Sequence, residues 1–149
     1  MALVSSDFHG NLRKLKKFLN YKPDELHIFA GDAVDSWNES YEDQEKCLKI
    51  LTESNCILLY GNHELSYHPT KPMSCSGRHK YGVEHFPKYL DDDRWGAAYA
   101  ADDYLITHAG IATPFHGTAK TAKSMAGVLN KKFKDGDKSI YAVGRCRGG

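Results

Sequence analysis

The sequence predicts an α/β fold built around a parallel sheet, because two patterns alternate along its first part. Short apolar runs at residues 2–4, 26–30 and 57–60 are typical of buried strands. Between them, residues 11–19 and 40–54 space their apolar side chains as one face of a helix. The order strand, helix, strand, helix, strand favours right-handed parallel crossovers within one sheet.

Both helical segments carry recognisable start signals. Asn11 begins the first segment, and Ser40 is a candidate N-cap of the second, with Asp43 in its first turn. The expected inner faces consist of Leu12, Leu15, Phe18 and Leu19 in the first segment and of Cys47, Leu48, Ile50 and Leu51 in the second.

The second half of the chain contains shorter elements. In order, the sequence predicts a loop or loosely helical lid over residues 66–80, a short helix interrupted by Pro87 over 81–90, a hairpin over 95–101 and 104–107, a helix over 118–133 and a last strand over 140–143. We expect residues 1–149 to form a single domain, since this length supports one buried core.

Composition limits which classes of partner and which cellular compartment we expect. A formal net charge of +1 gives no electrostatic reason to expect nucleic acid or a membrane surface as the main partner. No apolar run approaches the length of a bilayer span, and the N-terminus lacks the features of a signal peptide. The four cysteines are scattered without metal-site spacing, which is typical of reduced thiols, so we expect a cytoplasmic protein.

Polar clusters follow four strand-like runs and are the most informative feature of the chain. They are Asp7-Phe8-His9-Gly10-Asn11, Gly31-Asp32-Ala33-Val34-Asp35, Gly61-Asn62-His63-Glu64 and Thr107-His108-Ala109-Gly110. The carboxyl ends of parallel strands meet at one edge of a sheet, so these clusters should converge on one crevice. There, oxygen and imidazole ligands would form a two-metal site, in which both carboxylate oxygens of Asp32 could bridge two cations.

The candidate metal ligands are Asp7, His9, Asp32, Asn62 and His108. Their mixture of carboxylate, imidazole and amide suits two divalent ions of Mn, Fe, Zn or Ni better than Ca or Mg. Each residue taken alone also has a structural interpretation, as a helix cap, a buried histidine or a turn residue.

In this order and with these gaps, the four clusters resemble those of the calcineurin-like metallophosphoesterases. The similarity covers nearly all of the chain and is greatest to the small phosphatases of bacteriophages and to serine/threonine protein phosphatases. It implies a sandwich of two mixed sheets flanked by helices, whose second sheet could be incomplete here. It also implies that Asp7, His9 and Asp32 hold one metal, and that Asp32, Asn62 and His108 hold the other.

The resemblance further implies a mechanism of phosphate-ester hydrolysis. A hydroxide held between the metals would attack phosphorus, His63 would protonate the leaving group, and Asp35 would orient His63 and raise its pKa. Glu64 would have a structural role, such as a hydrogen bond to a neighbouring loop. The expected activity is that of a phosphatase, a phosphomonoesterase rather than a phosphodiesterase. Its substrate would be a phosphorylated small molecule, a nucleotide or a phosphoprotein.

The chain also departs from the family pattern. Ser36 and Tyr60 stand where the protein phosphatases carry arginines that grip phosphate, and Arg145 and Arg147 are candidate replacements. The family's last histidine ligand would lie beyond Gly149, so we expect a chain that lacks the family's C-terminal part and a second metal site with one ligand fewer. The other histidines, His68, His79, His85 and His116, are expected on loops or the surface.

These departures leave two alternatives open. The chain could be a non-catalytic remnant that serves as a binding or assembly module. It could also be a phosphodiesterase that acts on nucleotides.

Overall fold

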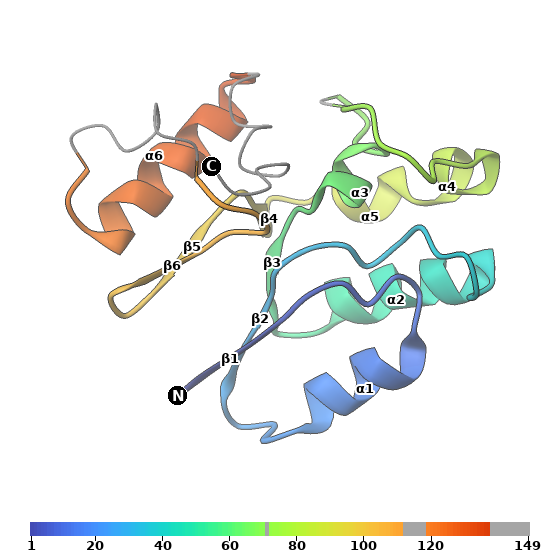
Figure 1. Cartoon of the computed structure of the whole chain (residues 1–149), viewed down its shortest axis with the longest axis horizontal. Coiled ribbons are helices and arrows are strands. Elements are labelled where there is room, and N and C mark those ends of the chain that lie inside the picture. Colours follow the sequence, from blue (N-terminus) through green and yellow to red (C-terminus); the bar gives the residue numbers. More distant parts are fainter. Residues whose placement is uncertain (71, 112–118, 138–149) are drawn as a thin grey trace.

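A parallel sheet forms the centre of the protein in a computed structural model that describes residues 1–70, 72–111 and 119–137 (Figure 1). Its strands, in spatial order, are β1 (Ala2–Ser5), β2 (Leu26–Phe29), β3 (Ile57–Leu59) and β4 (Trp95–Gly96). Every neighbouring pair is parallel. The first three strands and their parallel order are those that the sequence predicts.

Helices α1 (Leu12–Asn20) and α2 (Tyr41–Glu53) form the two crossovers between these strands. The side chain of Asn11 accepts the backbone N–H of Lys14, and Ser40 accepts that of Asp43 at 3.1 Å. The predicted apolar faces pack against the core: Leu15, Leu48 and Leu51 are fully inaccessible to solvent, and the outer members of both faces are partly buried.

Three short helices follow the third strand. They are α3 (Asn62–Leu65), α4 (Lys80–His85) and α5 (Pro87–Leu90). Pro87 opens α5, so the helix predicted over residues 81–90 is divided at this proline, where a ring without an N–H fits a first helical position. Helix α3 is not predicted, because its four residues are too few to show a helical period.

The predicted hairpin is only partly correct. Strands β5 (Tyr99–Ala101) and β6 (Tyr104–Ile106) pair in antiparallel fashion, but Trp95 and Gly96 belong to the parallel sheet, opposite Leu58 and Leu59. The reason is burial of the indole of Trp95, which is 4% exposed and packs against aromatic rings that precede it in the chain. A local alternation pattern cannot reveal such a contact.

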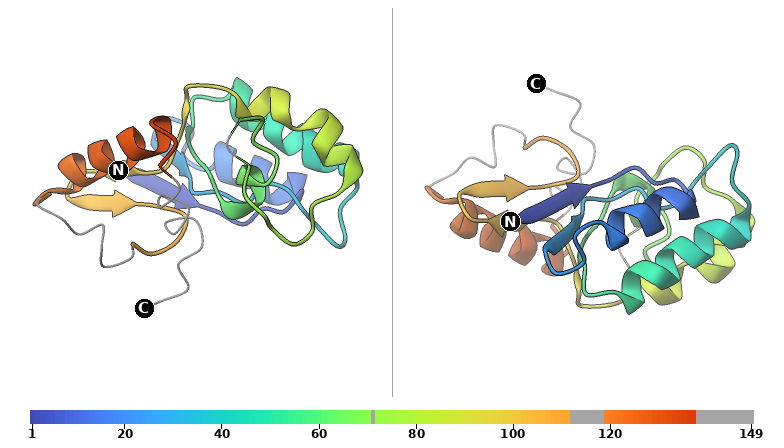
Figure 2. Two further views of the ribbon diagram at one scale, coloured as in Figure 1. Left: turned by 90° about the horizontal axis from the view of Figure 1, so that it is seen from above. Right: turned by 90° about the horizontal axis from the view of Figure 1, so that it is seen from below.

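Helix α6 (Ala122–Lys134) packs against the β5–β6 hairpin (Figure 2). Asn130 ties the helix to the sheet: its Oδ1 accepts the N–H groups of Ala97 and Ala98, and its Nδ2 donates to the carbonyl of Ala98 at 2.9 Å. This helix agrees with the prediction from residue 122 onward. Residue 118 and the strand predicted over 140–143 lie outside the described residues.

The two faces of the parallel sheet bury different partners. Phe29 and Leu58 belong to the larger core with the inner faces of α1 and α2. Ile28, Ala30 and Leu59 form a smaller core with side chains of the hairpin. The sheet is therefore covered by helices on one side and by the hairpin on the other.

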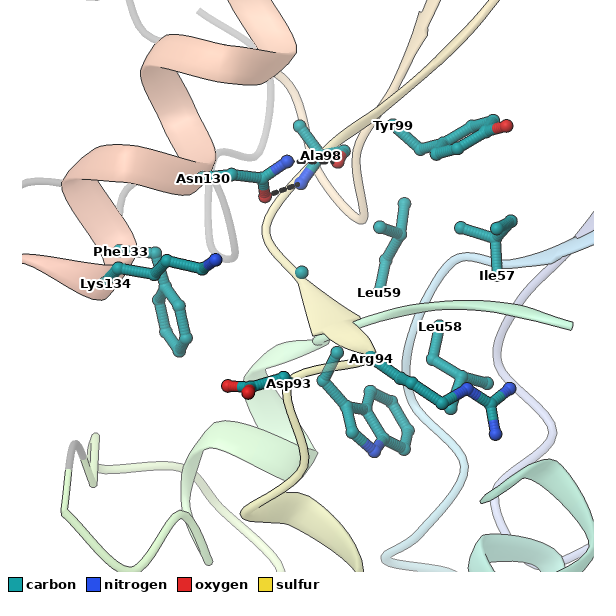
Figure 3. A pocket seen from close by; sticks show the side chains of 12 residues that line it. Ile57, Leu58, Leu59, Asp93, Arg94, Ala98, Tyr99, Asn130, Phe133 and Lys134 are labelled. Carbon is teal, nitrogen blue, oxygen red and sulfur yellow. Dashed lines mark hydrogen bonds between the residues drawn. The ribbon is translucent and has the colours of Figure 1, made fainter. Parts of the chain in front are cut away.

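A hollow of about 210 Å³ lies between the sheet and α6 (Figure 3). Ile57, Leu59 and Phe133 line it together with Arg94 and Asn130, and no residue of the polar clusters contributes to it. Among the described residues, no helix combines the length and apolarity needed to cross a membrane.

Glu45 joins α2 to the two following helices. Its carboxylate accepts hydrogen bonds from Tyr81 at 2.6 Å and Tyr89 at 3.0 Å, and pairs with Lys88 at 3.0 Å. Burial opposes the charge of Glu45, but these three donors outweigh it and lower its pKa from 4.5 to about 2.

We expect Glu45→Gln to lower the free energy of unfolding at pH 7 by about 1.5–3 kcal/mol, the usual scale for hydrogen bonds to a charged group. Because the folded-state pKa of Glu45 is depressed, its contribution is complete above pH 4.5 and is lost as the pH falls toward 2. The difference between wild type and variant should shrink over this range in urea titrations. Glu53→Gln, at an exposed glutamate of α2, is the control. A difference that stays constant with pH would contradict the role given to Glu45.

Candidate functional site

The loops that follow β1 and β2 are joined by backbone hydrogen bonds beyond the ends of the strands. The N–H of Asp7 donates to the carbonyl of Gly31 at 2.9 Å, and that of His9 donates to Asp32 at 3.0 Å. The first two polar clusters therefore converge as predicted, because the pairing of β1 and β2 continues into the loops that follow these strands.

Four non-glycine residues of these loops have a left-handed backbone. Asp7, His9, Asp32 and Asp35 have φ angles of 57°, 44°, 66° and 63°. Such angles are uncommon outside glycine, although Asp and His tolerate them better than most residues, and they concentrate at functional sites. The conformation turns the chain sharply after each strand and brings these side chains to one place.

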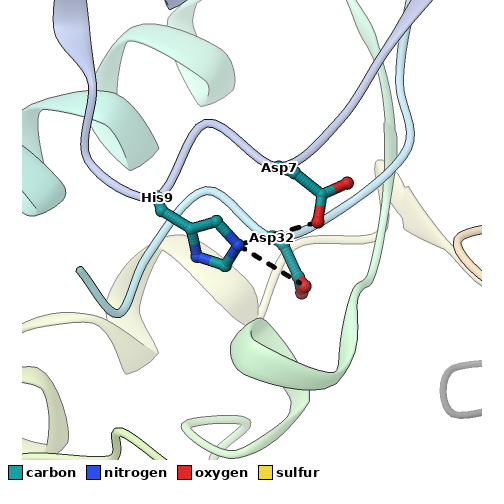
Figure 4. A group of neighbouring side chains, drawn as sticks. All are labelled: Asp7, His9 and Asp32. Atoms are coloured by element: carbon teal, nitrogen blue, oxygen red, sulfur yellow. Dashed lines mark ion pairs between the residues drawn. The ribbon is translucent and has the colours of Figure 1, made fainter. Parts of the chain in front are cut away.

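Asp7, His9 and Asp32 form a group whose ligand atoms all lie within 4.8 Å of one another (Figure 4). His9 Nε2 is 3.6 Å from Asp7 Oδ1 and 4.0 Å from Asp32 Oδ2. His9 Nδ1 lies 2.8 Å from the carbonyl oxygen of Val34. With the proton on Nδ1, this bond leaves the Nε2 lone pair facing the two carboxylates, the arrangement that a cation requires.

His108 faces the same carboxylate oxygen of Asp32 as His9 does, and its ring is oriented in the same way. Its Nδ1 lies 2.7 Å from the carbonyl oxygen of Ala30, and its Nε2 lies 3.3 Å from Asp32 Oδ2 and 3.2 Å from Asn62 Oδ1. Burial opposes the charge of His108, but the hydrogen bond to Asp32 and the charge of Asp32 raise its pKa to about 9. The five predicted ligand residues thus meet around one buried carboxylate.

The amide of Asn62 is oriented by a residue that the sequence analysis did not connect with the site. Asn62 Nδ2 donates to Cys75 Sγ at 3.0 Å, which turns Oδ1 toward His108. Cys75 lies in the segment predicted as a loop, so only its folded path places it here.

His63 and Asp35 form a close pair beside this cluster. His63 Nδ1 is 2.7 Å from Asp35 Oδ2, and the side chain of Asp35 is almost fully buried. Burial opposes the charge of His63, but the hydrogen bond to Asp35 and the charge of Asp32 outweigh it and raise the pKa of His63. The ring of His63 meets that of His9 edge-on, with 5.1 Å between centroids.

Asp35 has further partners that sequence reasoning missed. The hydroxyl of Tyr67 donates to Asp35 Oδ1 at 2.5 Å, and His79 Nε2 lies 3.5 Å from the same oxygen. The backbone N–H of Asp35 donates to the fully buried side chain of Gln44 at 3.0 Å. No local motif marks these residues, and His79 was expected only as a loop or surface histidine.

Glu64 connects the clusters to one another, as the structural role expected for it implies. Its Oε2 accepts the N–H groups of Asp32 at 2.7 Å and Gly61 at 2.9 Å, and its Oε1 accepts that of Ala33 at 2.6 Å. Burial and the charge of Asp32 raise the pKa of this fully buried carboxyl group, and the three backbone donors oppose that rise.

Two glycines of the clusters are required by close packing. A Cβ at Gly61 would lie 2.1 Å from Asp32 Oδ1, so a side chain there would displace the central carboxylate. Gly10 is needed because its φ is +80° and a Cβ there would lie 2.6 Å from Gln44 Cγ.

The two positions that replace arginine have structural contacts. The hydroxyl of Ser36 accepts the N–H groups of Asn38 and Glu39, and the buried Tyr60 donates to the carbonyl of Leu90 at 2.6 Å. His68 lies in the expected loop but is only 5% exposed and packs against Tyr60. Arg145, Arg147 and His116 lie outside the described residues.

Comparison with known proteins identifies the family of this chain. The family model for calcineurin-like phosphoesterases matches residues 2–139. The chain belongs to the calcineurin-like phosphoesterase family. Members of this family typically bind divalent metals, and the donor set of Asp7, His9 and Asp32 fits such an ion.

This calcineurin-like phosphoesterase is also similar to serine/threonine-protein phosphatase T of Saccharomyces cerevisiae. The two are 29% identical over 140 residues, which cover 82% of this chain and 26% of the yeast protein. The chain thus spans about a quarter of the length of that relative. No solved structure matches the chain significantly.

We expect Glu64→Gln to lower the free energy of unfolding of this phosphoesterase by about 2–3 kcal/mol, measured by urea denaturation. The amide would place an N–H₂ donor against at least one backbone N–H, which would leave a buried donor without an acceptor. Glu53→Gln again serves as the exposed control. A loss equal to that of the control would show that the loops hold together without this carboxylate.

Proposed function

We propose that this chain is a metal-dependent phosphomonoesterase that holds two divalent cations. The observation that carries the proposal is the arrangement around Asp32. The Nε2 atoms of His9 and His108, from the loops after β1 and β6, face its carboxylate. The His63–Asp35 pair lies beside them. A cation cluster next to a charged histidine is what hydrolysis of a phosphate ester needs: one group to stabilise the phosphoryl oxygens and another to protonate the leaving oxygen.

In this proposal Asp7, His9 and Asp32 hold one cation, and Asp32, Asn62 and His108 hold the other. Both histidines bond a backbone carbonyl through Nδ1 and keep Nε2 toward Asp32, which supports their assignment. Bound divalent cations would supply Lewis-acid chemistry, since they activate water and neutralise phosphoryl charge. Manganese, iron, zinc and nickel all suit this donor set.

His63 is proposed as the general acid. Asp35 accepts from its Nδ1 and favours the imidazolium, so the proton on Nε2 can pass to the leaving oxygen as the P–O bond breaks. Tyr67 and His79 act as positioning residues, because they hold the second oxygen of Asp35 and leave the first for His63.

A second candidate function is hydrolysis of nucleotide phosphodiesters. It is favoured by Ser36 and Tyr60, which provide no cation at the positions where protein phosphatases carry arginine. A diester carries one negative charge where a monoester carries two, so it depends less on such cations. Rates on bis(p-nitrophenyl) phosphate and on p-nitrophenyl phosphate distinguish the two, and the proposal requires the monoester to react faster.

Metal binding is tested without reference to activity. We expect protein equilibrated with manganese and then dialysed to retain the metal, and Asp7→Asn combined with His9→Ala to lose most of it, as measured by elemental analysis. Asn tolerates the left-handed backbone at position 7, so the variant should fold. Asp24→Asn, at an exposed turn, is the control. Equal and low metal contents in all three proteins would contradict the proposed site.

The role of His63 is tested by separating metal binding from turnover. His63→Ala should keep the metal content and lower kcat by about 100-fold or more on phenyl phosphate, the usual scale for loss of a general acid. The loss should be smaller on p-nitrophenyl phosphate, whose leaving group needs no proton. His85→Ala, at a partly exposed histidine near Glu45, is the control. A variant that loses metal would make His63 a ligand instead.

A further inference from the structure

A second hollow opens directly beside the His63–Asp35 pair. It encloses about 170 Å³, and Asp35, His63, Trp37, Tyr41, Gly77 and His79 contribute to its lining. Among the described residues, no lysine or arginine lines it. A space of this kind suits a neutral group better than a second phosphate or an acid.

Trp37 is the unusual member of this lining. Its side chain is 97% exposed, although tryptophan is normally among the more buried residues. The loop that carries it is fixed, because the hydroxyl of Ser36 accepts the N–H groups of both Asn38 and Glu39 at 3.1 Å. A rigid backbone thus presents a large aromatic surface to solvent next to the proposed general acid.

A second aromatic surface borders the hollow. Tyr41 stacks on His79 with 4.1 Å between ring centroids and 15° between ring planes, and it remains 47% exposed. His79 is held in turn by Asp35 and by Gln44. The hollow is therefore bordered by aromatic side chains, and its other lining residues are small or polar.

We propose that this hollow is a leaving-group subsite for a planar aromatic ring, which stacks on Trp37 and Tyr41 while the phosphate occupies the cation cluster. The inference rests on the proposed phosphatase function of the same site and specifies its substrate class. The ring can be joined directly to the leaving oxygen, as in an aryl phosphate such as phosphotyrosine, or through a ribose, as in a nucleoside 5′-phosphate. Stacking on aromatic side chains recognises either ring by its face.

Binding is measured first with phosphonates, which are not hydrolysed. Trp37 is exposed and Trp95, the chain's other tryptophan, is 4% exposed, so added ligands should act mainly on the emission of Trp37. We expect phenylphosphonate and the phosphonate analogue of 5′-AMP to bind the metal-loaded protein at least about tenfold more tightly than methylphosphonate. Of the two ring-bearing phosphonates, the one that binds more tightly relative to methylphosphonate shows whether the ring belongs to an aryl group or to a nucleoside. Equal affinity for all three would overturn the subsite.

Substitution tests the ring directly. Trp37→Ala should reduce the preference for ring-bearing phosphonates about tenfold in calorimetric titrations, whereas Trp37→Phe should retain most of it. Trp37 is almost fully exposed, so neither change should disturb folding. Tyr104→Ala, at a 75% exposed aromatic of the distant hairpin, should leave the preference unchanged. An unchanged preference in Trp37→Ala would also overturn the subsite.

Turnover separates this inference from the function on which it rests. 5′-AMP and ribose 5-phosphate have the same type of leaving alkoxide. The ratio of kcat/KM for 5′-AMP to that for ribose 5-phosphate therefore reports the contribution of the base alone. We expect Trp37→Ala to lower this ratio about tenfold. Hydrolysis of both at equal kcat/KM, together with equal affinity for the three phosphonates, would support the phosphatase and contradict the subsite. No hydrolysis of any phosphate together with a preserved preference for ring-bearing phosphonates would contradict the phosphatase and support the subsite.

Discussion

The carboxylate of Glu64 is the interaction on which the arrangement of the site depends. It is fully buried and binds backbone N–H groups of Asp32, Ala33 and Gly61, so it joins the loop after β2 to the start of α3. A buried carboxylate is tolerated only where its oxygens accept hydrogen bonds. Here the oxygens of Glu64 accept backbone N–H groups that the ends of the two strands cannot pair with one another. The position of Asp32, and with it the spacing of every donor around Asp32, follows from this connection.

The backbone of the loops after β1 and β2 is strained, and it depends on the surrounding structure in the same way. Asp7, His9 and Asp32 adopt left-handed angles that cost energy for residues with a Cβ, and such a conformation persists only where its surroundings enforce it. The enforcement comes from backbone bonds between the two loops and from the packed strands beneath them, where Phe29 and Leu58 are buried. The backbone that carries these side chains is therefore held in place before any ligand binds, which favours strong electrostatic effects in a site.

The sequence predicted the structure correctly where that structure depends on residues close together in the chain. Strand ends, helix caps and the convergence of Asp7 and Asp32 follow from local patterns and from the geometry of parallel sheets. His108 follows β6 of the antiparallel pair, so that geometry does not explain its approach to Asp32. The partners of Asp35 could not be predicted in this way. Tyr67 and His79 reach it through the path of residues 66–80, and that path is set by tertiary packing rather than by any periodic signal. The same reason explains Trp95, whose burial against distant aromatic rings overrides the hairpin pattern around it.

The loop after Asp35 shows how one change of residue alters what the site can recognise. An arginine directly after this aspartate, as in the related protein phosphatases, would direct a cation to the phosphate. Ser36 instead uses its hydroxyl to cap two backbone N–H groups and so fixes the turn that exposes Trp37. With the proposed subsite, recognition at this edge would depend on an aromatic face and not on charge. The cations of the proposed metal site would carry most of the attraction for phosphate, and selectivity among substrates would come from the group attached to it.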